Sequence, residues 1–267
     1  MARPDHISAS QLTMFNRCAM QWYFRYAEGK RIPPGVALIR GKSVHEAREM
    51  NLRQKVETGD DLPAEEVEAA ARDAVVAQFT GQVQLDSGQS PRRAKADCID
   101  GAVRLARCDY ECFQRSMQPR YVERRVTIHI PGLGLDIVGV LDTSDAAEVV
   151  RDLKTRSKTP SPREADRSDQ LTTYALMYRT IEGRLPKAVQ LDAVVDLKAG
   201  PQAVPLPSTR TVEELDVLVR RYYAAIRAIE KGAFVPCPAD SWVCQPKWCG
   251  YTDICPYYAR GESRPVD

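Results

Sequence analysis

The sequence lacks several features that would assign it to a common class of protein. No stretch reaches the roughly 18 apolar residues that a membrane-spanning helix needs, and the opening residues MARPDHISAS lack the apolar core of a signal peptide. The 38 basic and 36 acidic side chains nearly cancel, which leaves a formal net charge of +2. A polyanion could therefore bind only through the local placement of basic residues. We expect a cytoplasmic protein without membrane contact.

What is present is enough apolar sequence for a folded core, and many cysteines. A chain of 267 residues with 43% hydrophobic content can bury a sizeable core. Eight cysteines without a secretory signal favour metal ligation or burial over disulfides, because cytosolic thiols stay reduced. Three of them, Cys98, Cys108 and Cys112, stand beside apolar residues in a helix-like stretch and are expected to be small buried hydrophobes.

The order of periodic segments predicts helices first and a mixed sheet afterwards. Apolar residues recur at helical spacing up to about residue 117, and from residue 121 the period changes to two. The predicted elements, in order, are helices over 8–28 and 40–57, two or three helices within 63–117, a hairpin of strands over 121–130 and 135–141, a strand over 148–155, a helix over 163–181, strands over 188–196 and 202–206, and a helix over 211–231.

Two neighbouring strands carry the residues with the clearest chemistry. In the strand 149–154, alternation puts Asp152 and Lys154 on the same face. Asp142 closes the preceding strand and would lie beside Asp152 if the two strands pair. Two close carboxylates repel each other unless a cation lies between them, and their oxygens suit a hard divalent cation. Singly, each residue is explained by a solvated strand face or a turn, but together they predict a metal site with an ammonium group beside it.

The order of these residues resembles a known series of motifs. The series in this chain is Gly41-x-x-x-His45-Glu46, Gly139-x-x-Asp142, Asp152-x-Lys154 and Gln170-x-x-x-Tyr174. It is similar to that of the RecB-like branch of the PD-(D/E)XK nucleases. The resemblance implies an α/β fold with a restriction-endonuclease-like core, a central mixed sheet and an N-terminal helical region. It also implies a metal-dependent DNA exonuclease that hydrolyses phosphodiester bonds on single strands or at ends.

The resemblance further implies a role for each motif residue. Four metal ligands, three side chains and one backbone carbonyl, would hold Mg²⁺ or Mn²⁺: His45, Asp142, Asp152 and Leu153. Lys154 would orient or activate the attacking water, while Gln170 and Tyr174 would steady the site from the neighbouring helix. Glu123 stands on the first strand, where these nucleases often carry an acidic residue, although a surface position explains it equally.

Cysteines near the two ends of the chain extend the resemblance. The tail reads Cys244-x4-Cys249-x5-Cys255-Pro256, and the segment from Ser8 to Cys18 is similar to the N-terminal signature of the iron-sulfur members of this family. Those members include AddB-type helicase-nucleases and CRISPR-associated exonucleases. The implied ligands of a 4Fe-4S cluster are Cys18, Cys244, Cys249 and Cys255. Zinc is an alternative, because spacing alone does not separate the two. Cys237 is an alternative ligand, since the first tail gap usually holds two residues rather than four.

The resemblance also divides the chain into parts. One nuclease domain, 1–267, would contain N-terminal helices (1–60), a helical insertion or lid (61–118), a nuclease core (119–235) and a cysteine-rich cluster tail (236–267).

Three basic residues follow the Asp152 strand and predict contacts with the DNA backbone: Arg156, Lys158 and Arg163.

Two other functions compete with the exonuclease. One is a catalytically silent subunit, DNA-binding or scaffold, of a recombination or CRISPR adaptation assembly. The complete motif series argues against this function. A zinc-dependent DNA-binding module leaves the acids on the strands unexplained. The resemblance implies a bacterial, archaeal or phage-infected cell, with DNA and recombination or CRISPR adaptation proteins as partners.

Overall fold

The computed structural model describes residues 4–85 and 88–258; the end of the predicted tail, 259–267, lies outside the described residues. The chain forms two compact units, each assembled from separate stretches. Unit 1 contains Met1–Ile32, Thr127–Gly139 and Asp216–Asp267, and unit 2 contains Pro33–Val126 and Val140–Leu215. In the described part of the chain, no helix is both long enough and apolar enough to cross a membrane.

Unit 2 is organised around a mixed sheet. Its strands follow the order β3 (Asp136–Asp145), β4 (Val149–Arg156), β5 (Ala188–Leu197) and β6 (Gly200–Ser208), and β2 (Pro119–Ile128) pairs with β3. The pair β4 and β5 is parallel, whereas β3 with β4 and β5 with β6 are antiparallel. Parallel neighbours need a long crossover, which α6 (Asp169–Glu182) supplies. The predicted α/β fold with a central mixed sheet is confirmed.

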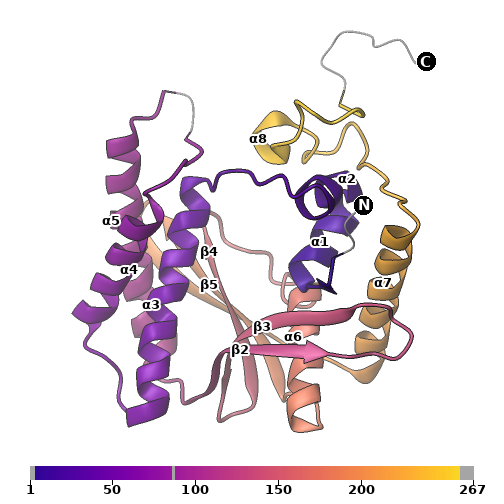
Figure 1. The fold of residues 1–267 in the computed structure, drawn as a ribbon. Helices are drawn as coiled ribbons and strands as arrows, with labels where there is room; N and C mark the ends of the chain where they lie inside the picture. The colour runs from indigo at the N-terminus through magenta and orange to yellow at the C-terminus, as the bar shows by residue number, and fades with distance from the viewer. Residues whose placement is uncertain (1–3, 86–87, 259–267) are drawn as a thin grey trace. The chain divides into compact units, whose positions relative to one another are not determined.

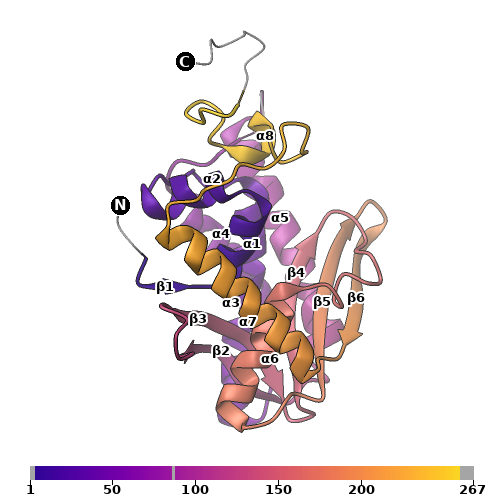
Figure 2. The ribbon, with the colours of Figure 1, turned by 90° about the vertical axis from the view of Figure 1, so that its right-hand side faces the viewer.

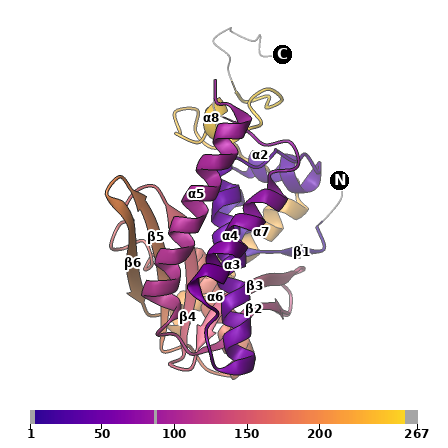
Figure 3. The ribbon, with the colours of Figure 1, turned by 90° about the vertical axis from the view of Figure 1, so that its left-hand side faces the viewer.

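Helices cover both faces of this sheet (Figures 1, 2 and 3). On one face lie α3 (Val36–Thr58), α4 (Ala64–Gln78) and α5 (Pro91–Asp109), which continues into the π-helix η2 (Tyr110–Gln114). On the other face α6 packs against β4 and β5. Buried apolar side chains of the three helices meet the sheet in one cluster, which includes Ile39, Val44, Ala71, Leu105, Leu153 and Val194.

Local sequence fixes the ends of the two helices that carry motif residues. The helix α3 starts after Pro33-Pro34-Gly35 and ends at Gly59, whose φ of 86° is the left-handed conformation that glycine adopts without strain. The helix α6 starts at Ser168, whose hydroxyl oxygen accepts a hydrogen bond from the backbone N–H of Leu171. The local sequence therefore sets where α3 ends and where α6 begins.

Unit 1 contains the first helices and most of the last one. Strand β1 (His6–Ile7) pairs in parallel with the beginning of β3, and α1 (Ala9–Arg17) follows it. Next come α2 (Ala19–Trp22) and the π-helix η1 (Tyr23–Ala27), and after β3 the unit holds α7 (Val212–Glu230) from Asp216 onward and α8 (Pro246–Cys249).

The predicted continuous helix over 8–28 is wrong at one residue. Cys18 adopts an extended conformation, with φ −163° and ψ 107°, and separates α1 from α2. The tail replaces the lost helical hydrogen bonds: the N–H of Ala19 donates to the carbonyl of Val235 at 3.1 Å, and the N–H of Cys237 donates to Cys18 Sγ at 3.4 Å. The break therefore turns Cys18 toward the cysteine-rich tail.

Candidate functional site

Three side chains from three elements of unit 2 meet at one point, which we call the metal pocket. His45 on α3, Glu123 on β2 and Asp142 on β3 each offer a ligand atom, and these atoms all lie within 4.8 Å of one another. The Nε2 of His45 lies 2.8 Å from the carbonyl oxygen of Leu153, and its Nδ1 lies 3.6 Å from Oδ2 of Asp142. Imidazole nitrogen with carboxylate and carbonyl oxygens is a donor set that suits Mg²⁺ or Mn²⁺.

Asp142 is held from the helix α6. The hydroxyl of Tyr174 donates to Asp142 Oδ1 at 2.7 Å, and the side-chain amide of Gln170 donates to that hydroxyl at 2.9 Å. The other oxygen, Asp142 Oδ2, is buried and has no hydrogen-bond partner among the described residues. A buried carboxylate oxygen needs a partner, and a divalent cation beside His45 fits that need.

Asp152 and Lys154 share the strand face that alternation predicts. The ammonium Nζ of Lys154 lies 3.0 Å from each carboxylate oxygen of Asp152, which is only 1% exposed. The strands β3 and β4 pair, which is the condition under which Asp142 lies beside Asp152; Thr143 stands opposite Arg151, so the same register carries Asp142 toward Asp152. Burial, and then repulsion by Asp142, raises the pKa of Asp152 despite the neighbouring ammonium.

Electrostatics in the metal pocket favour a cation. Burial lowers the pKa of His45, so its imidazole is neutral at pH 7, the form that binds metals. Burial and the nearby carboxylates of Asp142 and Glu49 raise the pKa of Glu123 to about 7.

The backbone of Glu123 has φ 47°, a conformation in which residues other than glycine are strained, and such strain clusters at functional sites. The sequence offered only the position of Glu123 on a strand, which gives no sign of this conformation.

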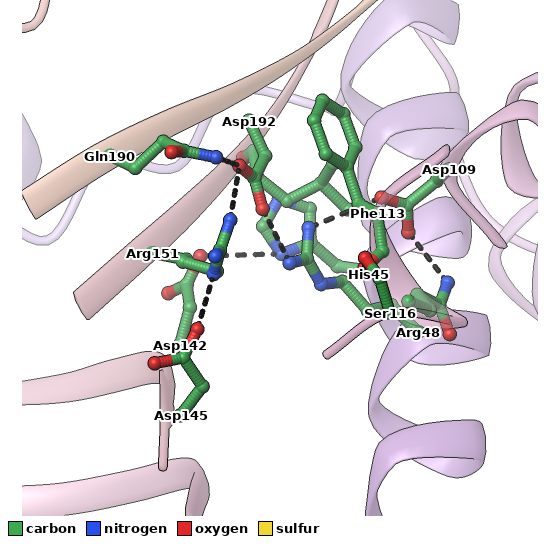
Figure 4. Close-up of polar contacts among 12 residues, drawn as sticks. His45, Arg48, Asp109, Phe113, Ser116, Asp142, Asp145, Arg151, Gln190 and Asp192 are labelled. Carbon is green, nitrogen blue, oxygen red and sulfur yellow. Dashed lines mark hydrogen bonds and ion pairs between the residues drawn. The ribbon is translucent and has the colours of Figure 1, made fainter. Parts of the chain in front are cut away.

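A buried ionic network lies behind the metal pocket (Figure 4). Arg48, one turn after His45 on α3, is 4% exposed and contacts Asp109 at 3.2 Å and Asp192 at 2.6 Å. Arg151 extends the network, because its guanidinium lies 3.4 Å from Asp192 and 3.0 Å from Asp145. These contacts tie α3 to α5 and to the sheet, so they fix the helix that presents His45. No motif or spacing in the sequence predicts this network.

Five cysteines line a second pocket, in unit 1, which we call the cysteine pocket: Cys18, Cys237, Cys244, Cys249 and Cys255. It includes the four predicted cluster ligands and the alternative Cys237. Burial, and the nearby Cys18, raise the pKa of Cys237 to about 12. After Cys249 the chain turns at Gly250, with φ 70°, where an added Cβ would lie 2.2 Å from Ile32 Cδ1. Only glycine fits at this turn.

The other sequence predictions fall outside both pockets. Arg156 ends β4 and forms an ion pair with Glu164, whereas Lys158 and Arg163 lie exposed in the segment that follows. Of the three cysteines expected to be buried, Cys98 is buried and Cys108 is intermediate. The prediction is wrong for Cys112, which is exposed in η2.

A mixed sheet that carries Asp142 on β3 beside Asp152 and Lys154 on β4, with His45 and Glu123 close to Asp142, defines an α/β protein with a metal-type site. The family model described as the PD-(D/E)XK nuclease superfamily matches residues 6–256. The chain therefore belongs to the PD-(D/E)XK nuclease superfamily, and nucleic acid is the class of ligand that this membership implies.

Two solved structures align with nearly the whole of this chain but have little sequence in common with it. A protein from Eubacterium rectale, described provisionally as an exonuclease, is 13% identical with a TM-score of 0.59, over 98% of this chain and 91% of that one. The protein SSO0001 is 14% identical with a TM-score of 0.43, over 97% of this chain and 89% of that one. No curated protein matches the sequence. At this identity the Eubacterium rectale protein supports the fold alone.

Proposed function

We propose that this protein is a metal-dependent DNA exonuclease that hydrolyses phosphodiester bonds on single strands or at ends. The observation that carries the proposal is the convergence of His45, Glu123 and Asp142 within 4.8 Å of one another, beside the Asp152–Lys154 pair. A silent scaffold protein would have no need to bury carboxylates this close together, because each costs free energy without a cation.

The chemistry follows from the residues in the metal pocket. A bound Mg²⁺ or Mn²⁺, held by His45, Asp142, Asp152 and the Leu153 carbonyl, would polarise the scissile phosphate and lower the pKa of a water molecule. Lys154 orients that water and adds positive charge where the phosphate gains negative charge in the transition state. Tyr174, held by Gln170, keeps one oxygen of Asp142 occupied and so leaves the other oxygen to face the cation.

The test is digestion of end-labelled DNA. Single-stranded and double-stranded substrates are incubated with Mg²⁺ or Mn²⁺, with a chelator, and with the Asp152→Asn variant as a matched control. We expect mononucleotides or short products from the labelled end, only with metal and only with the unaltered protein. Intact DNA under all metal conditions would favour the silent scaffold, and activity retained in Asp152→Asn would indicate a contaminating nuclease.

We further propose that the cysteine pocket holds a 4Fe-4S cluster with Cys18, Cys244, Cys249 and Cys255 as ligands. Thiolates are soft ligands that suit iron-sulfur clusters, and the pocket brings them together from opposite ends of the chain. Protein purified without oxygen should be brown and contain iron and sulfide. Zinc without iron in elemental analysis would contradict the cluster. Cys237→Ser should keep its iron, whereas Cys244→Ser should lose it; the reverse would make Cys237 the ligand.

We assign contacts with the DNA backbone outside the metal pocket to Arg156, Lys158 and Arg163. We place the activity in the cytoplasm of a bacterial, archaeal or phage-infected cell. Recombination and CRISPR adaptation are the two settings from which protein partners would come.

A further inference from the structure

A cleft in unit 2 is lined by the end of α3 and the beginning of β2, and it shares Glu123 with the metal pocket. Its volume is about 340 Å³, within the roughly 300–1,000 Å³ range typical of small-molecule sites. The lining residues are Arg53, Val56 and Glu57 of α3 and Arg120, Tyr121, Val122, Glu123 and Arg124 of β2. Glu123 belongs to both the cleft and the metal pocket, so a molecule in the cleft lies next to the cation site.

The backbone at Glu123 explains why consecutive residues line one cleft. Side chains of a regular strand alternate between its faces, so Val122, Glu123 and Arg124 would not all reach the same space. The left-handed φ of 47° at Glu123 interrupts that alternation. The strained residue therefore serves two purposes: it brings its own carboxylate to the metal pocket and places basic side chains beside it.

The guanidinium groups in the cleft differ in their partners. Arg53 pairs with Glu49 at 2.7 Å and Arg120 pairs with Glu182 at 3.0 Å. Arg124 lies over the Tyr121 ring, 4.2 Å from its centre, and has no carboxylate partner among the described residues. The Tyr121 hydroxyl in turn donates to Glu182. The Tyr121 ring therefore holds the Arg124 guanidinium in place, while the N–H groups of that guanidinium remain available as donors. This arrangement is suited to bind a phosphate.

We propose that this cleft binds one nucleotide of the DNA strand next to the scissile phosphate, with Arg124 contacting its phosphate and Val56 and Val122 its nucleoside. The proposal rests on the exonuclease function proposed above. The cleft offers what a nucleotide requires: an unpaired guanidinium, an apolar wall and a direct connection to the metal pocket through Glu123. Arg124 is a binding residue that the motif series does not contain.

The test compares Arg124→Gln with Arg125→Gln, a matched control on the same strand that lies outside the cleft. For an oligonucleotide, Arg124→Gln should raise KM about tenfold, because a charged hydrogen bond is lost, and change kcat much less. The slope of log KM against log salt should fall by about 0.7, the value for one phosphate contact on a single strand. Arg125→Gln should change neither quantity. Both variants should keep the melting temperature, since both side chains are exposed.

A small activated phosphodiester without a neighbouring nucleotide separates the two proposals. If the unaltered protein cleaves neither this substrate nor DNA with Mn²⁺, the exonuclease function itself fails. If it cleaves DNA and Arg124→Gln has the same KM as Arg125→Gln, the cleft proposal is overturned.

Substrates with phosphate or hydroxyl ends identify the group that Arg124 binds. If Arg124→Gln raises KM equally for substrates with both kinds of end, Arg124 binds a backbone phosphate. If it raises KM only for substrates with phosphorylated ends, Arg124 binds a terminal phosphate.

Discussion

The two units hold their functional side chains in different ways. In the metal pocket of unit 2, the side chains bind one another: Tyr174 donates to Asp142, and Lys154 lies between the oxygens of Asp152. In the cysteine pocket of unit 1, the thiols come from a helix break and a tail whose helix α8 has only four residues. The side chains of the metal pocket therefore position one another, whereas the cysteines are positioned mainly by the backbone of the helix break and of the tail.

The largest expected effect is on the cysteine pocket. Cys18→Ser should lower the free energy of unfolding by on the order of 5 kcal/mol, because the proposed cluster would close a loop of more than 200 residues between Cys18 and Cys244. Denaturant titration of purified protein measures this change. The matched control is Cys112→Ser, an exposed cysteine outside the pocket, which should change stability little. Equal stability of the two variants, with iron retained in both, would show that Cys18 is not a ligand of the iron.

The next largest effect is on the ionic network behind the metal pocket. Arg48→Met leaves Asp109 buried without a guanidinium and Asp192 with only that of Arg151, which should cost about 3–5 kcal/mol of stability. Arg107→Met is the control, because the ion pairs of Arg107 are partly exposed and each contributes about 1 kcal/mol or less. Similar denaturation midpoints for the two variants would show that the network does not fix α3.

A smaller effect is expected for the hydroxyl that steadies Asp142. Tyr174→Phe removes the 2.7 Å hydrogen bond and should weaken Mn²⁺ binding about tenfold, the usual cost of losing a partner of a metal ligand. Tyr178→Phe, one turn further along α6, is the control, because that buried hydroxyl has no hydrogen-bond partner among the described residues. Isothermal titration with Mn²⁺ compares them, and equal affinities would leave Tyr174 without a positioning role.

The smallest effect is a pH dependence of the metal-free protein. Folding raises the pKa of Glu123 to about 7 and of Asp109 to about 6, both mainly through burial, so the folded state binds more protons than the unfolded state between about pH 4 and 7. Stability should fall as pH rises through this window. The lowered pKa of His45 opposes the trend, and so do the lowered pKa values of exposed carboxylates near the acid end of the window: Glu28, Glu148 and Glu213.

Melting temperatures across this pH range, with and without Mn²⁺, test that dependence. Mn²⁺ should stabilise the protein more at pH 7.5 than at pH 5, because a cation favours the ionised carboxylates. Glu123→Gln should flatten the metal-free curve. A metal-free protein whose melting temperature rises steadily over the same range would contradict the assigned pKa shifts.

The sequence predicted the regular parts of the fold because they have regular causes. Period-two alternation placed Asp152 and Lys154 on one face, and the four-residue spacing of Gln170 and Tyr174 placed them on one side of a helix. The pattern left the pairing of β3 with β4 as a condition for bringing Asp142 toward Asp152, and the structure meets that condition.

The features that were missed depend on tertiary contacts. The helix break at Cys18 is stabilised by Val235 and Cys237, whereas the apolar period of the sequence continues through it. Arg48 meets Asp192 far along the chain, and no spacing rule links them. The left-handed conformation at Glu123 contradicts the preference of glutamate, so only the surrounding fold can impose it.

The central claim is that the metal pocket binds a cation that Lys154 assists but does not hold. The direct measurement is Mn²⁺ titration beside a cleavage assay on Lys154→Ala and Asp142→Ala. Lys154→Ala should bind Mn²⁺ and DNA yet cleave on the order of a hundredfold more slowly, because the charge beside the reacting phosphate is gone. Asp142→Ala should lose Mn²⁺ binding itself, since it removes a ligand. Full cleavage by Lys154→Ala, or unchanged Mn²⁺ affinity in Asp142→Ala, would contradict this account.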